Sequence, residues 1–470
     1  MTALKFNHRE HGEHGENNLM FSVAYVFSVV SFFVACDHAG IRIIFRGIEK
    51  LEALDMNKLL TEGIMKTFNY RMHKVSLLVL VAALLTLAVG MAFQLTPKDL
   101  PPPFHTPSAN NRPQVIPKPE DAQVKLPAGF NVEVSAEGFL KPRFMLLGPG
   151  NEILLSDSDD KGSVYVLLDK DRDGKIEEKT KIIDGLYRPY GLALWKEYLY
   201  VAEPGSLKRY KYDARTMKAT TPGQEVVSLS GFEKGHWTRS VLFDRSGGKM
   251  YLTVGSASNV DKGEDPKRAA INRYNPDGTG HEIYATGLRN TIGFRWYPGT
   301  DTLWAAVQER DGLGDNLVPD YFTSVKQGGF YGWPYAYIGP NEDPRRKGEE
   351  PGLVQKTLVP DVLLGSHVAV LDAIFYTGKM FPSRFQGGAF LAQHGSWNRS
   401  QRIGYNVVFV PYKNGKPAGT PQEFLSGFML APDKKEVWGR PVGLLQLPDG
   451  SLLVTDDGGN KIWRISYKAL

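Results

Sequence analysis

Residues 289–294 (RNTIGF), followed after a turn by residues 302–306 (TLWAA), contain the pattern that decides the fold. A polar residue opens a short apolar segment around a glycine, and a second strand then ends in small residues. Short runs rich in Val, Leu, Tyr and Ile between clusters of Gly, Pro, Asp and Asn are typical of β-strands. Since no long helical periodicity follows residue 126, the body of the chain is predicted to be all-β.

The same pattern occurs six times along the body of the chain. The copies begin near residues 143, 188, 236, 289, 367 and 440. About 57 residues per copy leave room for four strands and long loops, which suits a propeller blade. We therefore predict a six-bladed β-propeller over residues 126–470, in which polar residues at the starts of the innermost strands converge on a central channel. The alternative, a pair of β-sandwiches, explains six copies of one pattern less well.

Three segments are expected to precede the propeller. Residues 1–64 form a poorly defined extension with an apolar run at residues 19–36. Residues 65–95 contain an uncharged apolar run, 75–92, after several basic residues, which is typical of a signal peptide or a membrane anchor. Residues 96–125 are rich in proline and are predicted to be an extended, unpacked linker. The protein is therefore expected to be periplasmic or otherwise extracytoplasmic, and both a cleaved signal and an inner-membrane anchor fit residues 75–92.

Composition excludes several classes of function. The net charge of +5 comes from 56 basic and 51 acidic residues without a clustered basic face, so nucleic-acid binding is not expected. The single cysteine, Cys36, lies in the N-terminal apolar run. The region after residue 95 therefore has no disulfide, no cysteine metal site and no covalently attached c-type haem. Any electron chemistry in the propeller must come from a bound cofactor.

Several motifs carry a family resemblance. Residues 287–290 (GLRN), 328–334 (GGFYGWP) and Arg440 ahead of 447–450 (LPDG) resemble the soluble glucose/sorbosone dehydrogenases that depend on pyrroloquinoline quinone (PQQ). The resemblance covers about residues 126–470. Residues 394–399 (HGSWNR) are similar to the sorbosone-dehydrogenase-like branch, as are residues 316–321 (NLVPDY).

The resemblance implies a reaction and its cofactors. The C1 hydroxyl of an aldose, or a sorbosone-like sugar aldehyde, would be oxidised, with a histidine taking the proton and PQQ taking the hydride. A calcium ion (Ca2+) would polarise the quinone, and basic side chains would hold its carboxylates. A separate electron acceptor, a cytochrome or a quinone, would then reoxidise the cofactor.

Candidate site residues follow from position and from the resemblance. His236 opens an inner strand and is our candidate general base, since imidazole titrates near neutral pH. Arg289, with Asn290 beside it, is expected to contact the quinone, and its planar guanidinium also suits a carboxylate. By the same resemblance Arg440 is expected to bind the cofactor, and Arg399 lies near the position of a cofactor-binding lysine.

The resemblance also implies a metal site. Residues 309–316 line up with the calcium loop of the family, whose backbone carbonyls correspond to Asp311 and Gly312. A second acidic stretch, residues 169–174, resembles half of an EF-hand loop, but Thr180 occupies the twelfth position, where glutamate is expected. We interpret that stretch as a hairpin turn.

Two departures from the family keep other functions open. Val442 stands where a second cofactor-binding arginine is expected, and the second blade lacks a substrate-contacting glutamine, so the identity of the sugar is not predicted. A non-catalytic exported propeller that binds carbohydrate or a surface partner is the alternative. A calcium-dependent lactonase would need a set of acidic and Asn ligands, and no convincing set is evident.

Overall fold

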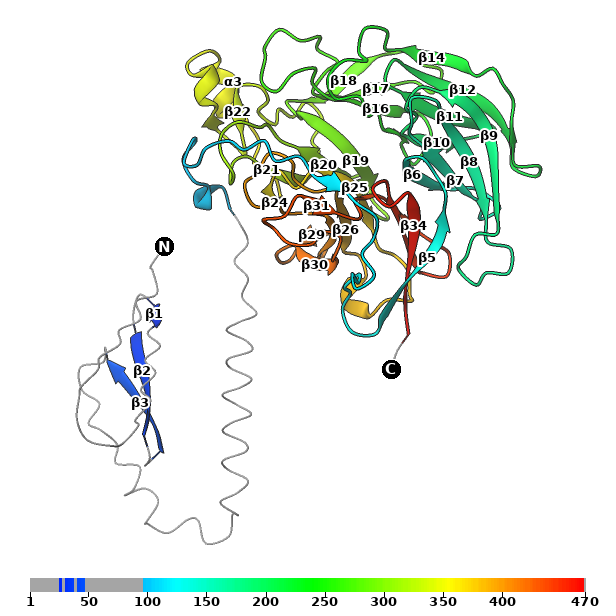
Figure 1. Ribbon diagram of the computed structural model, residues 1–470. Coiled ribbons are helices and arrows are strands. Elements are labelled where there is room, and N and C mark those ends of the chain that lie inside the picture. The colour runs from blue at the N-terminus through cyan, green and yellow to red at the C-terminus, as the bar shows by residue number, and fades with distance from the viewer. Residues whose placement is uncertain (1–24, 28–29, 38–39, 47–95, 469–470) are drawn as a thin grey trace. The chain divides into compact units, whose positions relative to one another are not determined.

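The computed structural model describes residues 25–27, 30–37, 40–46 and 96–468 (Figure 1). The chain separates into two compact units, Met1–Met91 and Ala92–Leu470. The described part of the first unit is an antiparallel sheet of β1 (Tyr25–Phe27), β2 (Val30–Asp37) and β3 (Gly40–Arg46). The predicted apolar run 75–92 lies outside the described residues. Within them, no helix has the length and apolar character that crossing a membrane requires.

The second unit is the predicted six-bladed β-propeller. Three antiparallel sheets form the first half of the ring. The first blade consists of β6 (Pro142–Leu147), β7 (Ile153–Asp157), β8 (Gly162–Leu168) and β9 (Glu178–Leu186). The second consists of β10 (Leu192–Trp195), β11 (Tyr198–Glu203), β12 (Ser206–Asp213), β13 (Lys218–Ala219) and β14 (Gln224–Ser228). The third consists of β15 (Val241–Phe243), β16 (Met250–Val254), β17 (Ala270–Tyr274) and β18 (Glu282–Thr286).

Three further sheets complete the ring. The fourth blade consists of β19 (Asn290–Trp296), β20 (Leu303–Gln308), β21 (Pro319–Ser324) and β24 (Val362–Ser366). The fifth consists of β25 (Val370–Phe375), β26 (Ala389–Gln393), β27 (Asn406–Val410) and β30 (Gln422–Leu425). The sixth consists of β32 (Pro441–Gln446), β33 (Leu452–Asp456), β34 (Lys461–Tyr467) and, from the other end of the propeller sequence, β5 (Phe130–Glu137).

The ring is closed by pairing between its two ends. Strand β5 runs antiparallel to β34, from Tyr467 opposite Phe130 to Lys461 opposite Glu137. Figure 1 shows the two strands side by side, although about 320 residues of sequence separate them. This pairing completes the four-stranded sheet of the sixth blade, with β5 as its outer strand.

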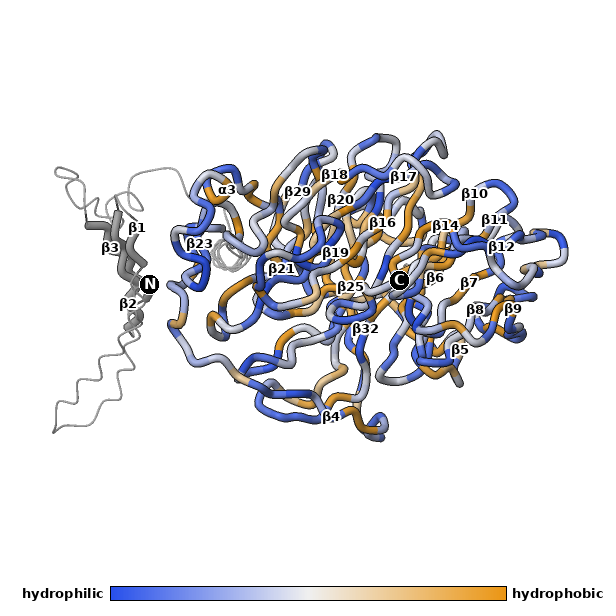
Figure 2. The backbone as a smooth tube through the Cα atoms, turned by 90° about the horizontal axis from the view of Figure 1, so that it is seen from above, coloured by the Kyte–Doolittle hydropathy of each residue, from blue (hydrophilic) through white to orange (hydrophobic). Residues whose placement is uncertain are grey.

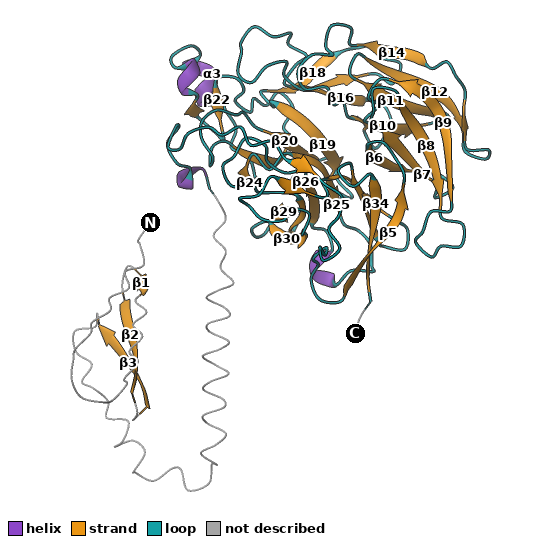
Figure 3. Cartoon of the chain, in the orientation of Figure 1, coloured by secondary structure: helices purple, strands orange, loops and turns teal. Residues whose placement is uncertain are grey.

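Short elements lie in the connections between and around the blades, and the few helical turns are short (Figure 3). The short strands are β4 (Gln114–Val115), β22 (Ala336–Tyr337), β23 (Asn341–Glu342), β28 (Tyr412–Lys413), β29 (Lys416–Pro417) and β31 (Glu436–Val437). The helical turns are η1 (Pro97–Asp99), η2 (Pro344–Arg346), α3 (Pro351–Lys356) and η3 (Ser383–Phe385).

The blades are apolar on both faces because each blade packs between two neighbours. Every residue of β7, β16 and β33 is buried, and apolar colour follows the strands in Figure 2. Buried apolar side chains from five inner strands or the turns before them belong to one hydrophobic cluster, and we call them the plug. They are Phe144, Tyr190, Ile292, Leu371 and Val442.

The proline-rich segment 96–125 is extended, as predicted, but it is packed and not free. Its strand β4 pairs in parallel with β31. The Arg402 guanidinium donates to Asn111 Oδ1 at 2.7 Å and to the carbonyl of Arg112 at 3.2 Å. A proline-rich segment forms no internal hydrogen bonds, so its sequence suggests that it is unpacked. Its backbone carbonyls nevertheless remain free to accept hydrogen bonds from other parts of the protein. We call residues 96–125 the strap.

Candidate active site

Polar residues gather where the inner strands begin. His236 precedes β15, Arg289 and Asn290 open β19, and Arg440 precedes β32. All inner strands of a propeller run in the same direction along the channel, so these positions share one end of it. The sequence prediction of convergence at this end therefore agrees with the topology.

His236 is a neutral histidine with one free ring nitrogen. Its Nδ1 lies 2.8 Å from the carbonyl oxygen of Ser256, so Nδ1–H donates and the proton resides on that nitrogen. The Nε2 atom forms no hydrogen bond within the described part of the chain. Burial lowers the pKa of His236 to about 3, and the positive charge of Arg289 adds to the effect. The imidazole thus presents an unprotonated acceptor.

Arg289 is buried and fixed to the loop that follows β20. It donates to the carbonyl of Glu309 at 2.7 Å and to Asn259 Oδ1 at 3.1 Å, and it lies 3.4 Å from Asp311 Oδ2. Burial lowers its pKa. A guanidinium held at several points loses little freedom when an anion binds to its remaining N–H groups.

Asn290 contributes a buried acceptor without a partner. Its Nδ2 donates to Gln308 Oε1 at 3.0 Å, while its Oδ1 has no hydrogen-bond partner among the described residues. A Cβ at Gly255 would lie 2.4 Å from that oxygen and 2.7 Å from the Cβ of His236. Glycine at position 255 is therefore what allows Asn290 and His236 to approach each other.

The side chain of Asp311 joins the fourth and fifth blades. His367 Nδ1 lies 3.5 Å from Asp311 Oδ1, and the Asn398 amide donates to the same oxygen. Burial raises the pKa of Asp311, but the His367 hydrogen bond and the Arg289 charge outweigh it and hold the pKa below its ordinary value. The sequence pointed only to the backbone of Asp311, because the role of its side chain depends on residues from two blades.

A second cluster continues around the same end of the channel. Asp457 accepts from Arg143 at 2.5 Å and lies 2.7 Å from His394 Nε2. Arg440 donates to the carbonyl of His394 at 3.2 Å but forms no ion pair with any described residue. Burial lowers the pKa of His394 to about 4, with Arg440 adding to the effect. Arg440 is therefore a cation that is available to an anionic ligand.

Trp237 connects the two clusters. The Arg143 guanidinium carbon lies 5.1 Å from the centroid of its ring, and the tryptophan directly follows His236 in sequence. Arg143 lies at the start of the first blade, and the sequence indicates it only as the beginning of the first copy of the repeated pattern. It supplies a second cation beside Arg440, whereas Val442 is fully buried in the plug and could not present an arginine to the ligand.

The structure does not bring Arg399 into this group. Its guanidinium donates to the carbonyl of Asp315, and its own carbonyl accepts from the Asn111 amide at 3.0 Å. Arg402 is fully buried and holds the strap. The buried Nε of Arg399 has no hydrogen-bond partner among the described residues, so its assignment as a cofactor ligand stays a prediction.

The Asp311 carbonyl, which was predicted to bind calcium, does not fit a cation. The carbonyl of Asp311 accepts from Asn259 Nδ2 and from Arg345 Nη1, each at 2.8 Å. A carbonyl that already accepts from two N–H groups, one of them cationic, is not free to ligate a divalent ion. The same guanidinium also lies close to Gly312, where a Cβ would be 3.0 Å from Arg345 Nη1.

The other acidic stretch is a hairpin, as predicted. Residues 169–177 connect β8 to β9, which pair antiparallel. Carboxylate oxygens of Asp169, Asp171, Asp173 and Glu177 lie within 4.8 Å of one another. All but Asp169 are exposed, and no helix flanks the loop.

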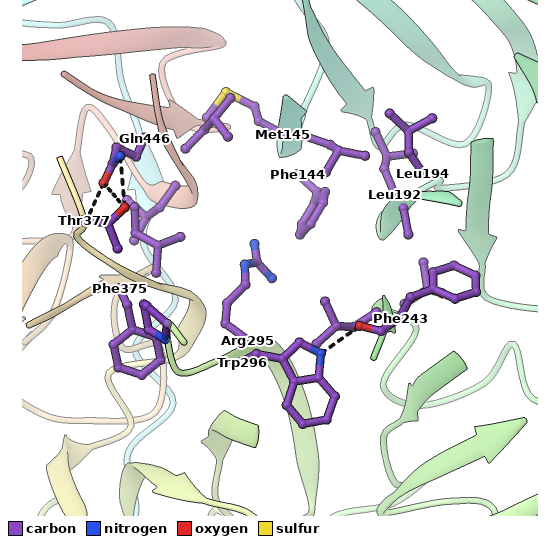
Figure 4. A pocket seen from close by; sticks show the side chains of 18 residues that line it. Phe144, Met145, Leu192, Leu194, Phe243, Arg295, Trp296, Phe375, Thr377 and Gln446 are labelled. Carbon is purple, nitrogen blue, oxygen red and sulfur yellow. Dashed lines mark hydrogen bonds between the residues drawn. The ribbon is translucent and has the colours of Figure 1, made fainter. Parts of the chain in front are cut away.

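A cavity of about 500 Å³ lies at the opposite end of the channel. It is lined mostly by apolar residues from the later halves of the inner strands, and Figure 4 shows Arg295 pointing into it between Phe144 and Trp296. Arg295 lies 3.2 Å from the buried Asp372, so this charge is paired within the protein. His236 is not among the residues that line this cavity.

Comparison with known proteins places this architecture. Residues 124–320 and 350–468 match the family described as TrAA12-like. A protein of Borreliella burgdorferi is 31% identical over 74% of this chain and 92% of its own length. The pyrroloquinoline quinone-dependent pyranose dehydrogenase of Coprinopsis cinerea is 24% identical over 73% of this chain, which spans 54% of that relative.

Solved structures show the same fold. A Trichoderma reesei carbohydrate-active enzyme of family AA12, in an iodide structure, has a TM-score of 0.64 at 20% identity. It covers 76% of this chain and is itself covered completely. The holo PQQ domain of the Coprinopsis cinerea pyranose dehydrogenase has a TM-score of 0.63 at 21% identity, with 74% of this chain and 98% of that domain covered.

Proposed function

The chain belongs to the TrAA12-like family, and we propose that it is a PQQ-dependent oxidoreductase that oxidises the C1 hydroxyl of an aldose or a sorbosone-like sugar aldehyde. The names of its relatives support this class, since the Coprinopsis cinerea protein is a PQQ-dependent pyranose dehydrogenase. The site supports it independently. A neutral histidine, a free arginine and further fixed arginines share one end of the channel.

One observation carries the proposal. His236 exposes an unprotonated Nε2 close to Arg289, and burial keeps the ring neutral, with a pKa of about 3. A general base must be unprotonated at the working pH and must reach the proton that it removes.

The residues at this end of the channel fit an anionic, planar cofactor. Arg440 has no ion pair within the described residues, and Arg143 lies near it. Arg289 keeps one Nη1–H for a carboxylate, since its other N–H groups donate to Asn259, Glu309 and Asp311. The unpartnered Oδ1 of Asn290 can accept from an N–H donor. When bound, PQQ supplies a two-electron acceptor that takes hydride from the sugar carbon.

The protein residues then have separable roles. His236 Nε2 takes the proton of the C1 hydroxyl as the C1–H bond breaks. Ser256 holds the ring by its carbonyl and stabilises the imidazolium that forms. Burial is the larger cause of the low pKa of His236 and the Arg289 charge is the smaller one, so an anion bound at Arg289 would offset only the second.

The test is reconstitution of the full chain, extracted in mild detergent. PQQ is added with and without calcium, and the absorbance of bound quinone and the reduction of a dye are followed with a panel of aldoses and sugar aldehydes. We expect stoichiometric PQQ binding and sugar-dependent reduction of the dye. Binding of a sugar with no binding of PQQ would instead identify a non-catalytic carbohydrate-binding propeller.

The surroundings of the reaction are part of the proposal. Residues 75–92 would export the propeller and either be removed or hold it at the membrane. Since the propeller has no cysteine for a covalent haem, a separate cytochrome or quinone would receive the electrons.

A further inference from the structure

We propose that Arg345 takes the place of the calcium ion that the family resemblance implies, so that the site binds its quinone cofactor without a divalent cation. The proposal rests on the proposed function for the identity of the cofactor. Its starting point is the carbonyl of Asp311, which accepts from Arg345 Nη1 at 2.8 Å. This is the carbonyl expected to ligate calcium.

Arg345 is a built part of the site and not a passing surface arginine. Its Nε and Nη2 donate to the two carboxylate oxygens of Asp343 at 2.9 and 2.8 Å. Asp343 is fully buried, caps the short helix η2 and also accepts from Arg310 at 3.1 Å. A bidentate pair with a buried carboxylate fixes the plane of a guanidinium. The third arm, Nη1, is thereby aimed at Asp311.

Charge and space both act against a cation at this position. A calcium ion needs oxygen ligands at about 2.3–2.6 Å. The Asp311 carbonyl already accepts from the guanidinium and from the Asn259 amide, and a divalent ion on the same oxygen would lie next to a full positive charge. The guanidinium also lies close to Gly312, since a Cβ there would be 3.0 Å from Nη1.

The arginine belongs to a part of this chain that the family pattern does not specify. The family match covers residues 124–320 and 350–468, and both Arg345 and its anchor Asp343 lie between the two stretches. The insert thus brings its own cation to a loop that the family pattern includes. Arginine stays protonated at every working pH, so this positive charge is permanent.

The experiment uses the full chain with Asp171→Asn and Asp173→Asn, which remove carboxylates of the acidic hairpin, so that calcium binding there cannot be mistaken for binding near Asp311. The protein is stripped with EGTA, and calcium stoichiometry and PQQ affinity are measured by calorimetry. We expect no calcium bound near Asp311, and a PQQ Kd that changes less than twofold between EGTA and calcium. A bound calcium ion on which PQQ affinity depends tenfold or more would overturn the proposal.

Two variants sharpen the test. Arg345→Met removes the charge at similar length, and we expect it to gain one calcium ion and to bind PQQ at least tenfold more weakly until calcium is added. Arg345→Lys keeps a charge and should gain no calcium. The matched control is Arg346→Met, whose side chain contacts Val260 and Glu349 outside the site.

The outcomes separate this inference from the proposed function. If Arg345→Met stays folded, by an unchanged melting profile, and gains no calcium, then the guanidinium does not occupy a cation position and the inference fails. If no form binds PQQ but Arg345→Met gains calcium, then the replacement stands and the proposed cofactor fails.

Discussion

At the scale of single residues, His236 is the group on which the chemistry depends. Replacing it with Asn keeps an amide that can donate to the Ser256 carbonyl but removes the basic nitrogen. We expect kcat for sugar oxidation to fall about 10²- to 10⁴-fold, the usual contribution of a general base, while the PQQ Kd changes less than threefold. Steady-state dye reduction and a PQQ titration measure the two quantities. Full turnover in a variant that binds PQQ would remove the base assignment.

The buried histidines also predict how stability depends on pH. Burial lowers the pKa of His236 to about 3 and that of His394 to about 4, both below the unfolded value of 6.5. The unfolded chain therefore binds more protons between these values, and stability falls as the pH falls below 6.5. Each histidine accounts for roughly 2 kcal/mol between pH 6.5 and 5.

Urea unfolding at the two pH values tests this sign. The His394→Gln variant keeps a donor for Asp457 but cannot titrate, so its free energy of unfolding should fall less than that of the wild type by about 2 kcal/mol. Because His367 has a raised pKa from its contact with Asp311, His367→Gln should shift the profile in the opposite direction. Equal losses in all three proteins would contradict the assignment.

At the scale of elements, the strap is held by one buried arginine. Arg402 donates to Asn111, to the carbonyl of Arg112 and to the carbonyl of Lys434 at 2.6 Å. We expect Arg402→Ala to cost about 3 kcal/mol, since it leaves buried carbonyls without donors. Limited proteolysis should then cut within residues 104–118 much faster than in the wild type. The control Arg215→Ala removes an exposed arginine and should change neither the stability nor the cleavage pattern.

The elements also show where prediction from sequence ends. The inner strands were predictable because each repeats one pattern with a local turn. The packing of the strap could not be predicted. Its proline content indicates that it lacks internal hydrogen bonds, but it does not indicate partners about 290 residues away, such as Arg402. Arg345 was missed for a similar reason. The role of the Arg345 side chain depends on its hydrogen bond to Asp311, which lies in another loop of the same blade.

At the scale of the whole molecule, symmetry explains which site residues could be found. A polar residue at the start of an inner strand must face the channel end, so His236, Arg289 and Arg440 follow from the repeat alone. Arg143 occupies the equivalent position in the first blade, and the repeat contained the signal for it. Arg399 lies in a loop after β26, where no periodicity fixes direction, so its place beside the cofactor is predicted from the family resemblance alone.

Ring closure makes the strongest prediction about the whole chain. Strand β5 is the outer strand of the sixth blade, and Phe130, Val132 and Val134 pack against the core of the fifth and sixth blades. A chain that starts at residue 138 would lack β5. It would leave β34 with an unpaired edge and would expose the apolar surface that β5 covers, so the ring could not close. A chain that starts at residue 126 keeps β5 and loses only the strap.

Thermal melting of the three chains, followed by circular dichroism, tests this. We expect chains from residue 96 to melt cooperatively, chains from 126 to melt at lower temperature, and chains from 138 to lack a cooperative transition. A native near-ultraviolet spectrum in the chain from residue 138 would show that closure by β5 is dispensable.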